Sequence, residues 1–412
     1  MKKIELLAPA GDLDKLKFAI MYGADAVYIG GQTFGLRAAA KNFSLEQMKE
    51  GIEFAHERGK KVYLTLNIIP HNDDINYLEA YIEEIRTLGL DAVILSDPGT
   101  FMFVKKHAPE LEVHLSTQAN NTNYMSAQFW HEQGMKRVIL ARELSFEEIA
   151  EIRAKTSPTL ELEAFIHGAM CISYSGRCLL SNYLNNRDAN RGACSHPCRW
   201  EYQLVEVNRP GEYIPIEETD AGTFFFNSKD LCMIENIPEL VKSGLDSLKI
   251  EGRMKSVYYV ANVVRAYREA LDTYYENPEA YVYNPQWFDE IKKASHREFT
   301  KGFYHNKPTQ LDQLYTSSSY IREYDFIGVV KAYDPVTKMA TVEQRNHFKV
   351  GDSVEVIGPD YFQAEMTISE IVNGKGESVE KAPHAQQIVT IPMEIPVEPY
   401  YIIRKPKEDL HE

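Results

Sequence analysis

A repeated alternation of short apolar runs and amphipathic stretches is the feature that most constrains the fold of this chain. It fills the first 168 residues, and its apolar runs lie at residues 4–8, 26–29, 61–66, 92–95, 112–115, 137–140 and 160–166. The amphipathic stretches between them have helical spacing, and several end at a glycine, as α-helices often do. Repeated strand–helix units predict a parallel sheet covered by helices.

An eighth unit of this kind comes much later in the chain. Residues 247–251 are typical of a strand, and residues 256–275 are typical of a long helix. Eight units predict an α/β fold, a (β/α)8 TIM-like barrel over residues 1–276, with a Cys-rich insertion at residues 169–245 between the seventh and eighth strands. A doubly wound open sheet is the alternative arrangement of the same units.

The pattern changes after residue 276. Residues 277–324 contain proline and aromatic residues with weak periodicity, and we expect a connecting region there. Short alternating strands, separated by turn signals such as Asn373-Gly374, then fill residues 325–405. This pattern predicts a small all-β barrel as the C-terminal domain.

Charge and hydropathy limit the classes of partner. The sequence shows no signal-peptide core and no run of about 18 apolar residues, so we expect a cytoplasmic protein with no membrane partner. Its 45 Lys and Arg residues face 60 Asp and Glu residues. This balance argues against nucleic-acid binding by bulk charge, because phosphate contacts need local cations. It leaves room for a local basic groove on an acidic body.

All five cysteines lie between residues 171 and 232. A reducing compartment disfavours disulfides, and such clustering indicates a ligand site. Four thiolates suit a tetrahedral zinc ion or a [4Fe–4S] cluster. A zinc ribbon usually has two short C-x2-C pairs, which this spacing lacks, so we favour the cluster and keep zinc as the alternative. Cys171, Cys178 and Cys194 belong to either ligand set. Cys198 is preferred as the fourth ligand, with Cys232 as its alternative.

Polar side chains stand at several predicted strand ends, where barrel enzymes build their active sites. Arginine is well suited to such sites because it binds carboxylates and phosphates through two parallel hydrogen bonds. The predicted substrate-binding residues are Arg37, Asn67, Gln118, Lys249 and Arg253. The predicted catalytic residues are Glu163, His167, Arg142 and Glu251.

Two stretches of the acidic chain are locally basic and contain interleaved aromatic residues. The first is residues 177–199 of the insertion, and the second is residues 249–268 around the eighth strand. Arginine and aromatic side chains together suit phosphates and unstacked bases. For the second stretch, an ordinary solvated helix face is an equally good explanation.

At the cysteines the chain resembles the peptidase U32 family. The family signature E-x-F-x2-G-[SA]-[LIVM]-C-x4-G-x-C-x-[LIVM]-S is complete here, from Glu163 through Gly168, Cys171 and Cys178 to Ser181. The segments ELLAPAG, GADAVYIGG, SLKIEGRMKS and HREFTKGFY also look like family segments. The resemblance therefore covers essentially the whole chain.

The resemblance implies one of two activities. Some members of the family are collagenase-like, and others are iron–sulfur hydroxylases that bind a [4Fe–4S] cluster through four cysteines. The latter hydroxylate the wobble uridine of tRNA, an rRNA cytidine or a ubiquinone precursor without O₂, and prephenate is implied as the oxygen source of the RNA-modifying members. The run CSHPCRWEY, the length of 412 residues and a tail that resembles domain 2 of elongation factor Tu are most similar to the tRNA 5-hydroxyuridine branch.

We therefore predict an O₂-independent tRNA hydroxylase that forms 5-hydroxyuridine at the wobble position. Its cofactor would be a [4Fe–4S] cluster, its co-substrate prephenate and its partner tRNA, with the C-terminal barrel docking the tRNA body. A U32-type peptidase that uses Glu163 or His167 is one alternative, although the chain has no H-E-x-x-H or G-x-S-x-G motif. A non-catalytic zinc RNA-binding factor is the other. A paralogous U32 subunit is a further partner that the sequence leaves open.

Overall fold

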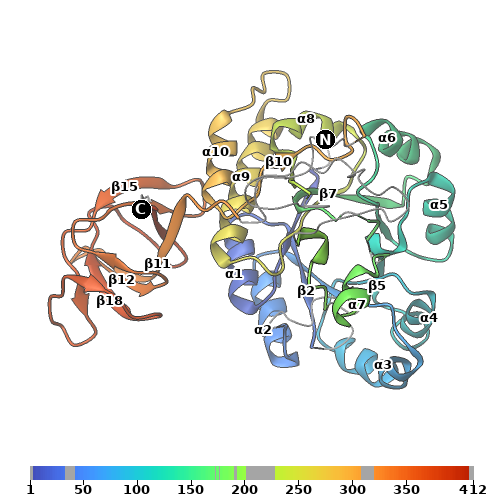
Figure 1. Ribbon diagram of the computed structural model, residues 1–412, viewed down its shortest axis with the longest axis horizontal. Coiled ribbons are helices and arrows are strands. Elements are labelled where there is room, and N and C mark those ends of the chain that lie inside the picture. Colours follow the sequence, from blue (N-terminus) through green and yellow to red (C-terminus); the bar gives the residue numbers. More distant parts are fainter. Residues whose placement is uncertain are drawn as a thin grey trace, which may run out of the picture.

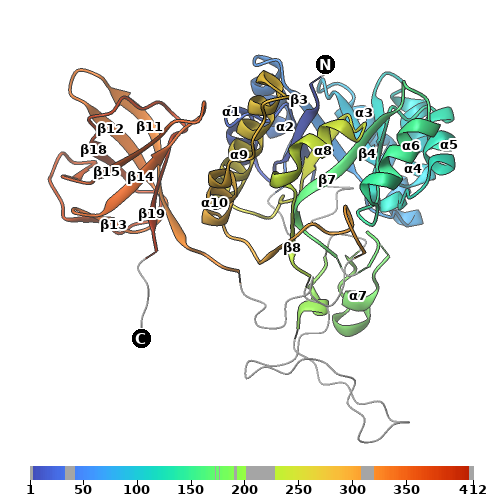
Figure 2. The same cartoon turned by 90° about the horizontal axis from the view of Figure 1, so that it is seen from above.

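The structure is a computed structural model that describes residues 3–32, 42–171, 173–175, 177–189, 193–200, 228–307 and 320–407. Figure 1 shows a barrel of alternating strands and helices, coloured blue to yellow, beside a smaller all-β domain in orange and red. Figure 2 shows the N-terminus at one end of the barrel and helix α7 (Leu180–Asn185), from the Cys-rich segment, at the other.

Eight parallel strands close into a barrel. Seven of them pair in sequence order, and β9 pairs with both β1 and β7, which closes the ring. Because helices cover the outside and the ring encloses the inside, these strands are largely buried on both faces. The strands are β1 (Glu5–Pro9), β2 (Ala26–Gly30), β3 (Lys61–Leu66), β4 (Ala92–Leu95), β5 (Glu112–Leu115), β6 (Arg137–Ile139), β7 (Glu161–Ala169) and β9 (Ser247–Ile250). The predicted barrel is confirmed, and the open-sheet alternative is wrong.

Helices follow the barrel strands in turn. Ser44 and Ser145 begin two of them with capping boxes, in which the serine hydroxyl accepts from the backbone of Gln47 or Glu148 and that side chain accepts in return. No helix in the described ranges is long and apolar enough to cross a membrane. The barrel helices are α1 (Leu13–Met21), α2 (Leu45–His56), α3 (Asn72–Ile85), α4 (Pro98–His107), α5 (Tyr124–Glu132), α6 (Phe146–Lys155), α8 (Ile237–Lys242) and α9 (Val257–Glu276).

Short elements extend the barrel at the C-terminal ends of its strands. Strand β8 (Asp230–Cys232) pairs antiparallel with the end of β7, and β10 (Phe299–Thr300) pairs parallel with β8. Helix α8 falls within residues 169–245, which we predicted as an insertion, and it occupies the position of the barrel helix between β7 and β9. The short 3-10 turns are η1 (Thr117–Ala119), η3 (Pro197–Arg199) and η4 (Ile234–Asn236).

The C-terminal domain is antiparallel and all-β, as predicted. It contains a seven-stranded sheet in the order β15-β14-β19-β11-β12-β18-β16 and a two-stranded sheet of β13 and β17. Its own apolar core lies between these strands. The strands are β11 (Tyr324–Asp334), β12 (Met339–Gln344), β13 (Phe348–Lys349), β14 (Ser353–Ile357), β15 (Gln363–Thr367), β16 (Val372–Asn373), β17 (Lys381–Ala382), β18 (Ile388–Pro392) and β19 (Ile402–Pro406).

The C-terminal domain packs against α1, α9 and α10 (Pro285–Lys293), as Figure 1 shows. At this contact Arg404 of β19 is completely buried. Its Nη2 lies 2.6 Å from a carboxylate oxygen of Glu355 and 2.6 Å from one of Glu290, and its Nη1 donates to Asn262 Oδ1 at 2.9 Å. Burial raises the pKa of both carboxyls, but Arg404 and Lys293 together outweigh it and hold each pKa below its ordinary value.

Replacing Arg404 by Met would leave Glu355 and Glu290 in the interface without this cation. Removing one partner of a buried ion pair costs about 3–5 kcal/mol, so we expect the free energy of unfolding to fall by about that amount in urea denaturation at neutral pH. Because both pKa values are lower in the folded chain than their ordinary 4.5, the stabilisation is complete above that pH and is lost as the pH falls further. The difference between variant and wild type should therefore shrink in acid.

The matched control is Lys338→Met, which removes an exposed ion pair with Glu394. Exposed pairs contribute little to stability, so this variant should have the denaturation midpoint of the wild type. An Arg404→Met midpoint equal to that of the control would contradict the importance of this contact.

Candidate functional site

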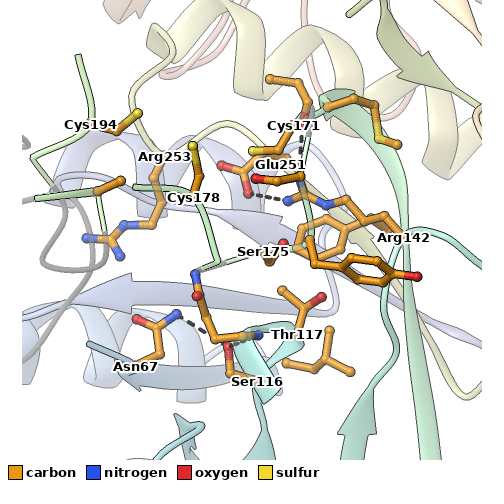
Figure 3. A pocket seen from close by; sticks show the side chains of 18 of the residues that line it. Asn67, Ser116, Thr117, Arg142, Cys171, Ser175, Cys178, Cys194, Glu251 and Arg253 are labelled. Atoms are coloured by element: carbon orange, nitrogen blue, oxygen red, sulfur yellow. Dashed lines mark hydrogen bonds and ion pairs between the residues drawn. The ribbon is translucent and has the colours of Figure 1, made fainter. Parts of the chain in front are cut away.

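A cavity of about 170 Å³ lies at the C-terminal end of the barrel strands, between the barrel and the Cys-rich segment. Side chains that follow β3, β5, β6, β7 and β9 line one side, and residues of the segment 171–198 line the other. In the view of Figure 3, Cys171, Cys178 and Cys194 lie at one side, with Asn67 and Ser116 opposite. This is the end of the barrel at which TIM-barrel enzymes carry out their chemistry.

Most of the residues predicted from the sequence meet at this cavity. Glu163, His167 and Cys232 are buried and are not among its described lining residues. Arg37 lies outside the described residues. The predicted residues that line the cavity are Asn67, Gln118, Arg142, Lys249, Glu251, Arg253, Cys171, Cys178, Cys194 and Cys198.

Arg253 is oriented by two neutral side chains. Its Nη1 donates to Thr65 Oγ1 at 3.1 Å, and its Nη2 donates to Asn42 Oδ1 at 3.0 Å. Gly30, at the end of β2, provides the space, because a Cβ there would lie 2.1 Å from Nη2 of Arg253. Thr65 and Asn42 therefore fix a buried guanidinium at the cavity without adding a negative charge.

Arg142 makes three contacts at the cavity wall. Its Nη1 donates to the carbonyl of Ala169 at 3.1 Å, and its Nη2 lies 3.3 Å from Glu251 Oε2. Its guanidinium carbon lies 4.0 Å from the ring centroid of Phe165. The Nε atom of Arg142 is buried, and no hydrogen-bond acceptor in the described part of the chain reaches it.

Glu163 holds the third cation of the cavity. Its carboxylate is fully buried, with Oε1 2.8 Å from Nζ of Lys249 and Oε2 2.9 Å from Nη1 of Arg137. Lys249 Nζ also lies 4.4 Å from the ring centroid of Tyr28. Glu163 is not among the described residues that line the cavity. It pairs with Lys249, which does line it.

His167 lies in an aromatic environment on the other side of β7. Its ring contacts Tyr259, Tyr267 and Phe299, and its Nδ1 lies 3.4 Å from the Tyr267 hydroxyl. Burial, with a smaller contribution from the charge of Lys255, lowers the pKa of His167 to about 3. It is therefore neutral at physiological pH and is packed as a core side chain.

Neutral polar side chains form the wall opposite the cysteines. Asn67 Nδ2 lies 3.5 Å from Ser116 Oγ, and Thr117 Oγ1 donates to the carbonyl of Leu140 at 3.1 Å. Gln118 Oε1 is buried, and among the described residues it has no hydrogen-bond donor. Buried polar atoms are normally paired, so this oxygen is available for a donor on a bound molecule.

Four cysteines of the Cys-rich segment line the same cavity. Cys171 is exposed, and Cys178, Cys194 and Cys198 are half-buried. The backbone N–H of His196 donates to Cys194 Sγ at 3.4 Å. No group of three or more His, Cys, Asp or Glu side chains in the described ranges is placed to hold a single metal ion. Four thiols on one side of a cavity are a donor set that suits a cluster, in which each thiolate binds a separate iron.

Cys232 lies away from these four thiols. It is completely buried in β8, where it lies opposite His167 of the neighbouring strand β7. Burial raises the pKa of its thiol to about 11, whereas a metal ligand must be a thiolate. Cys232 therefore has the properties of a small apolar core residue.

The Cys-rich segment is attached to the barrel by hydrogen bonds. Asn120, which follows η1 and has a left-handed backbone, donates to the carbonyl of Ser175 at 2.9 Å and accepts from Arg177 Nε at 2.7 Å. Gly168 of the signature has a φ of +105°, and a Cβ on it would lie 2.6 Å from the carbonyl oxygen of Glu251. Only glycine allows this approach between the ends of β7 and β9.

The hydroxyl of Ser181, the last residue of the signature, organises the chain next to Cys194. It accepts from the backbone N–H of Ser195 at 3.0 Å, and its oxygen lies 3.0 Å from Ser195 Oγ. Asn185 of α7 donates to the same Ser195 hydroxyl at 2.7 Å. These bonds fix the two halves of the Cys-rich segment to each other.

Sequence reasoning missed the residues that orient the cations. Thr65, Asn42 and Tyr28 are far from Arg253 and Lys249 in the chain, and no motif connects them. Phe165 and Ser181 stand in the signature and could have been singled out by it. Ser116 directly follows strand β5, just as the predicted polar residues stand at the ends of their strands.

The second basic stretch, residues 249–268, is used largely for packing. Arg265 is buried and donates to the carbonyl of Tyr361 at 2.8 Å. Arg268 pairs with Asp25 and Asp272. These two arginines neither form a solvated helix face nor point to an RNA contact, so both expectations are wrong for them.

Comparison with known proteins gives close matches. A family model described as peptidase family U32 matches residues 11–314, and one described as peptidase family U32 C-terminal domain matches residues 322–404. The tRNA hydroxylation protein P1 of Bacillus subtilis (strain 168) is 45% identical over 406 residues, which are 98% of this chain and 96% of that protein. The tRNA hydroxylation protein P of Escherichia coli (strain K12) is 37% identical over 433 residues, 95% of this chain and 94% of that protein.

Among solved structures, a match covers the C-terminal region. The C-terminal domain of a Geobacillus thermoleovorans protein described as a U32 peptidase is 42% identical. The match covers 20% of this chain and 99% of that chain, with a TM-score of 0.19.

Gly168→Ala tests the close approach of β7 to Glu251. The added Cβ meets a backbone oxygen at a positive φ, and backbone strain of this kind costs about 1–3 kcal/mol. We expect the free energy of unfolding in urea to fall by about this amount. Gly374→Ala is the matched control, because its Cβ would meet nothing closer than 3.9 Å. Equal urea-denaturation midpoints for Gly168→Ala and Gly374→Ala would contradict a close approach of Gly168 to the Glu251 carbonyl.

Proposed function

The chain belongs to peptidase family U32, and from this membership we propose that it is an RNA-hydroxylating enzyme whose substrate is tRNA. The family resemblance predicted from the signature is thereby confirmed. The observation that carries the proposal is the match to proteins named for tRNA hydroxylation along nearly the whole chain. The product is 5-hydroxyuridine at the wobble position, made in the cytoplasm without O₂.

The proposed cofactor is a [4Fe–4S] cluster held by Cys171, Cys178, Cys194 and Cys198. These thiols share one cavity, whereas Cys232 is buried apart from them. When bound, such a cluster supplies a redox-active, Lewis-acidic iron site. The Cys194 sulfur already accepts a backbone N–H, and hydrogen bonds to sulfur are one of the ways in which proteins tune such a group.

The proposed oxygen donor is prephenate, which carries two carboxylates. Three cations line the cavity, and each is held by a neighbouring side chain: Arg253 by Thr65 and Asn42, Arg142 by Glu251, and Lys249 by Glu163. Pre-oriented arginines bind carboxylates through paired hydrogen bonds. In this proposal Arg253, whose guanidinium Thr65 and Asn42 orient at the cavity, takes one carboxylate.

The polar wall is proposed to bind the uracil base. A uracil edge offers one N–H donor between two carbonyl acceptors. Gln118 Oε1 is a buried acceptor available to the N–H, and Asn67 and Ser116 lie on the same side of the cavity. A base can reach this wall only by leaving the stack of the anticodon loop.

Glu251 is the proposed acid–base group. Replacing the hydrogen on C5 of uracil by a hydroxyl group is a two-electron oxidation that also releases a proton. The Glu251 carboxylate lines the cavity beside Arg142 and would accept that proton, whereas the two electrons would pass to a separate electron acceptor. Glu163 and His167 have no part in this scheme, because the first holds Lys249 and the second is a neutral core side chain.

Anaerobic purification should give a brown protein that contains iron and acid-labile sulfide in equal amounts. Cys198→Ser should lose most of the visible absorption and iron, since it removes one of the four ligands. Cys232→Ser is the matched control and should keep both. A colourless protein that contains zinc, or loss of iron in the Cys232 variant alone, would contradict the assigned ligands.

Hydroxylation is tested in a strain that lacks this gene and any paralogue, by mass spectrometry of tRNA nucleosides. Wild-type chain should restore 5-hydroxyuridine. Arg253→Lys keeps the charge but loses the fork that Thr65 and Asn42 orient, so we expect roughly tenfold or greater loss of product.

Lys106→Ala, at an exposed position on α4, should restore wild-type levels. Wobble uridine that is unmodified even with the wild-type chain would refute the proposed activity.

A further inference from the structure

A second concavity of about 580 Å³ lies beside the cavity and between the two domains. We name it the interdomain groove, and its walls include Arg187 of the Cys-rich segment, Lys255 of the barrel, Arg322 before β11 and Phe326 of the C-terminal domain. Three separate parts of the chain therefore form one channel. The proposed activity does not use it.

The interdomain groove and the cavity are adjacent and share a wall. Four residues line both: Ala169, Cys194, His196 and Glu251. A nucleotide whose base enters the cavity remains covalently joined to its neighbours, which must leave through an open edge. The groove begins at this shared edge, where the Cys-rich segment meets the end of β7.

The charge of the interdomain groove is opposite to that of the chain. Among the described residues that line it, Arg187, Lys255 and Arg322 stand against the single carboxylate of Glu251, in a chain whose formal net charge is −15. Glu251 is itself paired with Arg142. A local cationic channel on an acidic body attracts a polyanion to one place.

The two exposed arginines are placed to meet phosphates. Arg187 is fixed by a bond from its Nε to the carbonyl of Ala193 at 2.9 Å, and Arg322 is exposed at the other wall. Lys255 is already engaged, because its Nζ lies 3.7 Å from the ring centroid of Tyr320 and donates to the carbonyl of Ser295. Arg187 and Arg322 therefore provide the available positive charge.

The floor of the groove is aromatic. Phe326 is half-buried and stacks on Tyr258, with ring centroids 5.7 Å apart and planes 15° from parallel. Met254 adds an exposed apolar side chain. A cationic rim over an apolar, aromatic floor suits a nucleic-acid single strand, whose phosphates and bases need both.

We infer that the interdomain groove binds the single-stranded RNA next to the target nucleotide, with Arg187 and Arg322 on its phosphates. The inference rests on the proposed function, which supplies the RNA substrate. It gives the C-terminal domain a role in the site, since Phe326 forms one wall of the groove.

Binding of an anticodon stem-loop RNA, with uridine at the first anticodon position, tests this inference. Fluorescence anisotropy over a series of KCl concentrations compares the wild-type chain with the double variant Arg187→Ala/Arg322→Ala. Each lost single-strand phosphate contact lowers the slope of log K against log [salt] by about 0.7. We expect a slope smaller by about 1.4 and an affinity roughly 10- to 30-fold lower at 0.1 M salt.

Lys106→Ala and Lys105→Ala together form the matched control, because both lysines are exposed on α4, away from the groove. This control should bind as the wild type does. A double arginine variant with wild-type affinity and slope would contradict RNA binding in the interdomain groove, and so would a control whose affinity falls as much as that of the double variant. Either result would leave the proposed function intact. A wild-type chain that does not bind the stem-loop at all would overturn the proposed function and the inference together.

Discussion

The Glu163 carboxylate, buried inside the barrel between Arg137 and Lys249, is the interaction on which the rest of the structure depends. These three residues lie on β7, β6 and β9, and Arg137 also pairs with Glu5 of β1. These ion pairs connect β6 and β7 with β9 and β1, which lie on the two sides of the point where the barrel closes. Buried charges are tolerated only when paired, so this network favours the closed barrel over an open sheet. It also fixes Lys249, which lines the cavity, and so connects closure of the barrel with the charge of the site.

The periodicity of the sequence predicted the barrel because mostly apolar strands alternate along the chain with amphipathic helices. Polar residues at strand ends predicted most of the cavity for an equally physical reason, since the C-terminal ends of parallel strands meet at one edge. The role of His167 could not be predicted in this way. The pairing of β7 with β9 shifts register between Phe165 and His167, and such a shift changes the side to which later residues point. The partners of Arg253 escaped prediction because Asn42 and Thr65 reach it only through the fold.

The two domains meet beside the site. Arg404 fastens the C-terminal domain to α9 and α10 through Asn262 and Glu290, and this contact places Phe326 beside the Cys-rich segment. The acidic composition, which taken alone argues against RNA, is consistent with a narrow cationic channel between the domains. A substrate that is bound there depends on few contacts, so its binding is both sensitive to salt and restricted to one place.

We propose that four cysteines at the mouth of the barrel hold an iron–sulfur cluster beside a polar wall for uracil. Anomalous X-ray scattering at the iron absorption edge, from crystals of anaerobically purified protein, tests it most directly. We predict iron density enclosed by Cys171, Cys178, Cys194 and Cys198, next to Arg142 and Arg253. Density for zinc in its place, or iron bound at Cys232, would contradict the claim.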